Sequence, residues 1–147
     1  MNSIVSNDRE QALSQDEALC HLFFHCCLED ETFTGAEMDD LSAKLVALGL
    51  DKKVNVKEEL IRYRSVKPSI TDERVYITQL LRLINPVNEL ALYSYCVELC
   101  LDDPFLDARE EALLNKIRDA LEIEEAAANT IHRLIAQRRA TSLQQLF

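Results

Sequence analysis

The chain has little glycine and proline, with two Gly and three Pro among 147 residues. This scarcity argues against a turn-rich sheet protein and favours helices, because both residues interrupt helices and build turns. It also nearly excludes a phosphate-binding loop, which depends on glycine. No apolar run approaches the ~20 residues that cross a bilayer, and the first residues lack the pattern of a signal peptide. We therefore expect a cytoplasmic protein without a membrane span.

The composition suits one folded domain. Hydrophobic residues make up 48% of the chain, which is enough for a core and too much for disorder. The length also fits one domain, which we expect to cover residues 1–147. The formal net charge is −10, so the surface repels phosphate backbones and nucleic acid is not expected as a partner. Basic partners and divalent cations suit such a surface better.

The five cysteines are an odd number and lie within apolar helical runs. This placement is not typical of a disulfide framework and predicts buried, reduced thiols. His21 and His25 are four residues apart and could share a zinc ion. No third ligand follows at a usual spacing, however, and we favour the alternative of two histidines at the flank of a buried helix.

Capping motifs and apolar spacing predict where the helices begin and end. Capping boxes are expected at 14–17, 34–37 and 107–110. Gly49 is expected to end one helix, because glycine tolerates the left-handed conformation that follows a helix. Asn55 is a candidate for the start of the next helix.

Three further helices are expected in the second half of the chain. Thr71 is expected to begin a helix that runs to residue 84, and Asn85 with Pro86 the one after it, since proline suits the first helical position. The last helix is expected at 124–139, with Leu134 among its buried residues. No segment alternates like a strand, so the prediction is an all-α fold of about seven helices.

An internal repeat is visible in the sequence. Residues 18–50 align without gaps on residues 91–123, and nine of the 33 aligned pairs are identical. Each copy has the pattern Asp-x-x-apolar-cap-x-x-Glu. We expect two pseudo-repeated three-helix units, at about 15–66 and 87–139. The helix at 71–84 is expected to bridge them within one compact domain.

The repeated pattern resembles that of TerB-like proteins, the tellurite resistance family. The second copy matches with Asp103, Leu106, Asp107 and Glu110, the first copy with Asp30, Phe33, Thr34 and Glu37, and the end of the following helix with Leu48, Gly49 and Leu50. The glycine that usually follows the leading Asp is absent, because Glu31 and Pro104 stand in its place.

The resemblance implies a fold and a class of function. It implies an all-α fold of two similar halves and a non-catalytic cytosolic module in tellurite resistance and in metal or envelope stress. It also implies acidic residues that bind a divalent cation. The candidate ligands are Asp30, Glu37, Asp103, Asp107 and Glu110.

Helix capping offers an alternative role for most of these carboxylates. Thr34 with Glu37, and Asp107 with Glu110, fit capping boxes completely. Capping does not explain Asp30 and Asp103, which are expected at the C-terminal end of the preceding helix. An acid at that end opposes the helix dipole. Either these two carboxylates accept hydrogen bonds from the N–H groups of the next turn, or they bind a cation. The cation hypothesis depends on them.

The basic residues gather in one stretch, which begins with Lys52, Lys53 and Lys57. Such a stretch is typical of a solvated helix face, and it could also dock an acidic protein partner. The alternative function is therefore a metal-independent interaction scaffold with acidic and basic faces. No catalytic residue is predicted, because the chain has no nucleophile motif, so we do not expect an enzyme.

Overall fold

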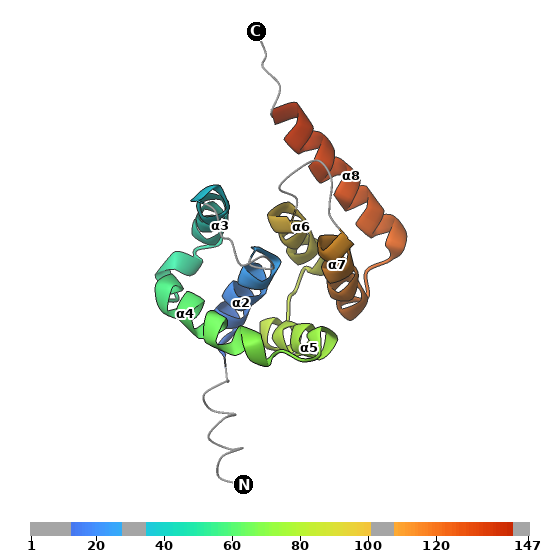
Figure 1. The fold of residues 1–147 in the computed structure, drawn as a ribbon. Helices are drawn as coiled ribbons and strands as arrows, with labels where there is room; N and C mark the ends of the chain where they lie inside the picture. The colour runs from blue at the N-terminus through green and yellow to red at the C-terminus, as the bar shows by residue number, and fades with distance from the viewer. Residues whose placement is uncertain (1–12, 28–34, 101–107, 143–147) are drawn as a thin grey trace.

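The computed structural model describes residues 13–27, 35–100 and 108–142 (Figure 1). These residues contain helices and no strand, which confirms the all-α class. The seven α-helices are α2 (Gln15–Cys27), α3 (Gly35–Ala47), α4 (Val56–Val66), α5 (Glu73–Ile84), α6 (Glu89–Cys100), α7 (Ala108–Leu121) and α8 (Glu125–Ser142). Two 3₁₀ turns, η1 (Leu50–Lys52) and η2 (Lys67–Ser69), precede and follow α4.

Helix α2 lies at the centre of the fold and packs against α3, α4, α5 and α6 (Figure 1). Nine of its thirteen residues are buried, so the helix is surrounded rather than amphipathic. Its predicted capping box is confirmed. The backbone N–H of Glu17 donates to Ser14 Oγ at 3.1 Å, and the N–H of Ser14 donates to Glu17 Oε1 at 2.8 Å.

One hydrophobic core joins the described helices around α2. Helix α5 packs against both α2 and α7, and α8 packs against α6. The largest fully buried side chains are Tyr63, Tyr93, Phe23, Phe24, Leu22, Leu41, Leu45, Leu50, Ile77, Leu113, Leu114 and Ile117. None of the helices seen in the described ranges has the length and apolar character that crossing a membrane requires.

Two predicted helix starts are wrong. Asn85 does not begin α6 but ends α5 in a left-handed conformation with φ 45°, which asparagine adopts more readily than most residues. Helix α6 begins at Glu89 instead. The side chain of Asn88 caps it by accepting a hydrogen bond from the N–H of Ala91 at 2.9 Å.

The start of α5 is also displaced by one residue from the prediction. Its cap is Asp72 rather than Thr71, and the Asp72 carboxylate accepts from the N–H of Val75 at 3.2 Å. The boundaries predicted at Gly49 and Asn55 are confirmed. Gly49 has φ 73° just after α3, and Asn55 caps α4 by accepting from the N–H of Glu58 at 3.2 Å.

The burial predicted for α8 is partly wrong. Leu134 was expected inside but is 51% exposed, whereas its neighbour Ile135 is buried. Helix α8 packs mainly against α6, so the helical rotation from one residue to the next is enough to place Leu134 in solvent.

The helix boundaries repeat at the spacing that the sequence alignment predicts. Adding 73 to the bounds of α2 and α3 gives those of α6 and α7 to within one residue. That the two halves also superpose in space stays a prediction. The segments that carry most of the repeated motif, 28–34 and 101–107, lie outside the described residues.

Candidate functional site

Most of the predicted cation ligands lie outside the described residues. This holds for Asp30, Asp103 and Asp107, and for the side chain of Glu37. Glu110 is described, lies half-buried in the first turn of α7, and already has an interaction partner. Within the described ranges no group of three or more His, Cys, Asp or Glu side chains could hold a metal ion. The cation site therefore stays a prediction.

The predicted basic residues are exposed along η1 and α4. Lys53, Lys57, Ile61 and Arg64, together with Lys52, form what we call the basic face. Lys57, Ile61 and Arg64 follow one another at helical spacing and share one side of α4. Ile61 is 70% exposed at the middle of this side. The basic face thus combines an apolar centre with flanking cations.

The four cations of the basic face form no side-chain ion pair with any residue that the structure describes. Asp51 and Glu58 are also exposed nearby and reduce the local positive charge. The face nonetheless has more cations than anions, in a chain whose net charge is −10.

A buried polar network fixes α4 against α2 on the side away from the basic face. His21 Nε2 lies 2.8 Å from Glu59 Oε1, and His25 Nδ1 lies 2.7 Å from the hydroxyl of Tyr63. Both pairs are 38 residues apart, so successive turns of α2 meet successive turns of α4. The two histidines bind different groups, which agrees with the favoured alternative of helix-flank histidines rather than a shared zinc ion.

The network continues through α5 to α7. His25 Nε2 lies 2.8 Å from Glu73 Oε2, and Lys116 Nζ lies 2.6 Å from Glu73 Oε1. Because a carboxylate only accepts hydrogen bonds, His25 donates through Nε2. The hydrogen bond from His25 and the contact with Lys116 hold the pKa of Glu73 down to about 2, although burial opposes this. Glu73 therefore links α2 and α7 as a carboxylate.

Sequence reasoning missed the partners of both histidines. Glu59 is not among the residues that the sequence predicts to be functional or buried, yet it is 6% exposed. One signal was present in the sequence. The i, i+4 pair His21 and His25 has a matching i, i+4 pair in Glu59 and Tyr63, and polar residues at matched spacing suit two packed helices.

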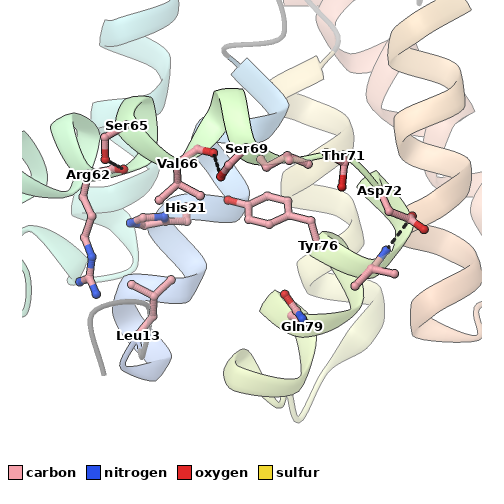
Figure 2. Close-up of a pocket in the computed structure, with 12 residues that line it drawn as sticks. Leu13, His21, Arg62, Ser65, Val66, Ser69, Thr71, Asp72, Tyr76 and Gln79 are labelled. Atoms are coloured by element: carbon pink, nitrogen blue, oxygen red, sulfur yellow. Dashed lines mark hydrogen bonds between the residues drawn. The ribbon is translucent and has the colours of Figure 1, made fainter. Parts of the chain in front are cut away.

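A cavity of about 470 Å³ opens beside this network, among residues of α2, α4, η2 and α5 (Figure 2). His21 lies on its wall together with Arg62 from α4 and Tyr76 from α5. The hydroxyl of Tyr76 is buried and has no hydrogen-bond partner. The cavity therefore contains polar groups of three separate elements.

The five cysteines are buried and form no disulfide, as predicted. Burial raises the pKa of Cys20 to about 12, and nearby carboxylates add to this effect. The thiol of Cys100 lies 3.8 Å from the carbonyl oxygen of Cys26. Because the thiolate is the reactive form, the raised pKa makes the Cys20 thiol unreactive. All five cysteines are buried, and we assign them to packing.

Acid should destabilise the fold in two stages. Burial lowers the pKa of His21 despite its contact with Glu59, and burial likewise lowers the pKa of His132. As pH falls below about 6.5 the unfolded chain binds protons that the folded protein does not, so stability falls. A second loss follows as pH falls from 4.5 toward 2, because Glu73 must become protonated.

Urea unfolding at pH 7.5, 5.5 and 3.5 measures both stages, because these values lie one unit to either side of the ordinary pKa of histidine, 6.5, and of glutamate, 4.5. We expect the free energy of unfolding to decrease at each step. The variant His21→Gln should show a smaller decrease between the first two values. A free energy that is constant or rises between pH 7.5 and 5.5 would contradict the lowered pKa of His21 in the folded protein.

The comparisons with known proteins leave the predicted family untested. No family model, no curated protein and no solved structure matches the chain. The TerB-like resemblance therefore stays a prediction.

Proposed function

We propose that the chain is a non-catalytic, TerB-like helical module that binds an acidic protein partner through the basic face. One observation carries this proposal. Lys57 and Arg64 flank the exposed Ile61 on α4, and Lys53 is exposed just before that helix. None of these three cations has an ion-pair partner among the described residues. Cations that no internal acid neutralises attract an acidic surface and steer its approach.

The composition of the basic face also fits a binding surface. Interfaces commonly have an apolar centre that excludes water and a polar rim that provides specificity. Ile61 supplies the apolar centre, and the cations supply the rim. The buried partners of α4, Glu59 and Tyr63, fix the helix from behind, so little order has to be gained on binding.

The partner that we favour is a different protein rather than a second copy of this chain. With a net charge of −10, two copies repel each other at long range, whereas an acidic segment of another protein meets the basic face directly. The surface is small, so a short acidic segment with at least one apolar residue fits it best. Such binding should weaken as salt screens the charges.

Charge reversal tests this proposal. We expect the variant Lys53→Glu/Lys57→Glu to lose its partner in a pull-down from an extract of the source cells. The matched control is Arg82→Glu/Arg133→Glu, which reverses two exposed cations on α5 and α8. Both variants change the net charge from −10 to −14, since each substitution contributes −2. Calorimetry with the purified partner should then show at least roughly tenfold weaker binding for the first variant only.

Two results would overturn the proposal. One is an unchanged set of partners for the charge-reversed basic face. The other is a mass from light scattering that shows self-association of the wild-type chain, abolished by Lys53→Glu/Lys57→Glu, which would make a second copy the occupant of the face.

The expected cation remains a separate proposal, supported by the repeated motif of the sequence. In this form the module acts in tellurite resistance or in metal or envelope stress, and Asp30 and Asp103 are the critical ligands. Calorimetric titration with Ca²⁺, Mg²⁺ and Zn²⁺ tests it. We expect binding that Asp30→Asn/Asp103→Asn abolishes, and binding no tighter than millimolar would count against a cation site.

A further inference from the structure

The cavity beside the polar network has the size of a small-molecule site. Its volume of about 470 Å³ falls within the range of roughly 300–1,000 Å³ that is usual for ligand pockets. Figure 2 shows Tyr76 lying across the pocket with its hydroxyl directed toward His21. Arg62 and Val66 reach the pocket from a different side of α4 than the basic face, whereas Ser65 lies one turn after Ile61. The two surfaces therefore differ in most of their residues and adjoin at Ser65.

The charged residues that line the pocket are already engaged within the protein. The guanidinium of Arg62 lies 3.8 Å from Glu17 Oε1 and 3.6 Å from Glu59 Oε1. The carboxylate of Asp72 accepts a hydrogen bond from the N–H of Val75. A charged ligand would have to leave its own hydration without gaining an uncommitted opposite charge. The pocket therefore favours an uncharged ligand.

The hydroxyl groups of the pocket differ in what they can offer. Ser65 Oγ donates to the carbonyl oxygen of Arg62 at 2.8 Å, and Ser69 Oγ donates to that of Val66 at 2.6 Å. Both protons are thus used. The hydroxyl of Tyr76 has no partner although it is buried, and a buried donor without an acceptor is unfavourable. Among the lining residues, Tyr76 is therefore the one whose hydroxyl is buried in the protein and has a proton that no protein acceptor uses.

We propose that this pocket binds an uncharged amphipathic small molecule whose carbonyl oxygen accepts a hydrogen bond from the Tyr76 hydroxyl. The apolar part of the ligand would lie against Val66, Ile70 and Val75, which line the same pocket. Because the hydroxyl is covered in the free protein, the phenol ring has to shift when the ligand enters. This shift breaks no hydrogen bond, since the hydroxyl makes none.

The test uses hexanamide as the probe, with hexanoate and hexylamine as charged analogues of similar length. We expect hexanamide to shift the amide ¹H–¹⁵N resonances of Thr71, Val75 and Tyr76 in an NMR titration, and the two charged analogues to leave them in place. The variant Tyr76→Phe should bind hexanamide on the order of tenfold more weakly, as for the loss of one hydrogen bond. The control Tyr95→Phe changes a tyrosine outside the pocket and should bind like the wild type.

The thermal midpoint of Tyr76→Phe separates loss of binding from loss of folding. It should equal or exceed that of the wild type, because the substitution removes a hydroxyl without a partner. Four results would overturn the proposal: no shift of pocket resonances up to the solubility limit of hexanamide, equal binding of a charged analogue, unchanged affinity in Tyr76→Phe, or a lowered thermal midpoint for that variant.

Discussion

Replacing His25 with leucine should lower the free energy of unfolding by about 3 kcal/mol. The substitution removes two hydrogen bonds at once, one to the hydroxyl of Tyr63 and one to a carboxylate oxygen of Glu73. Tyr63 is fully buried, so water cannot replace the lost contact, and leucine roughly preserves the packing volume. Urea unfolding at pH 7.5 measures the loss.

A graded series of variants isolates the contribution of the network. Glu73→Gln keeps an acceptor for His25 and loses the ion pair with Lys116, so it should be less destabilising than His25→Leu. Tyr63→Phe and Tyr76→Phe each remove one phenol hydroxyl, from two different environments. The first should destabilise the protein and the second should not, because only Tyr63 has a hydrogen-bond partner. A His25→Leu variant as stable as the wild type would show that the network does not hold the helices together.

The variant Phe24→Ala should lower the free energy of unfolding by about 4 kcal/mol. Phe24 is fully buried on the central helix. Its ring centre lies 6.1 Å from that of His21 and 5.9 Å from that of Tyr63. The substitution therefore removes apolar surface and opens a cavity between α2 and α4, where both histidines have their partners. The same urea experiment measures the effect.

Ile61→Ala is the matched control for the loss of apolar side-chain atoms. Because Ile61 is 70% exposed, its truncation should change stability by less than about 0.5 kcal/mol. The same variant should weaken the binding of the acidic partner, since Ile61 is the apolar centre of the basic face. A Phe24→Ala variant no less stable than Ile61→Ala would contradict the central position of α2.

Much of the fold could be predicted from local sequence signals. The capping box at Ser14, the glycine at position 49 and the cap at Asn55 each act within a few residues, and the structure contains them. Asn85 shows the limit of such reasoning. Asparagine can cap the start of a helix or end one in the left-handed conformation. Asn85 ends α5, and the nearby Asn88 caps the start of α6.

The candidate sites were predictable to different extents. The basic face depends on charge and helical spacing alone, so Lys53 and Lys57 were identified before the structure. The partners of His21 and His25 depend on how α2 packs on α4, which is a contact across 38 residues. The unsatisfied hydroxyl of Tyr76 depends on the same packing. A sequence has no local signal for the absence of a hydrogen-bond partner.

Cross-linking of the partner complex tests the central claim most directly. A carbodiimide joins a lysine to a carboxylate in direct contact, and the chain has six lysines: Lys44, Lys52, Lys53, Lys57, Lys67 and Lys116. The proposed interface predicts that peptides of the partner become linked to Lys53 and Lys57, through glutamate or aspartate of an acidic segment. Links at Lys44 or Lys116, with none on the basic face, would contradict it.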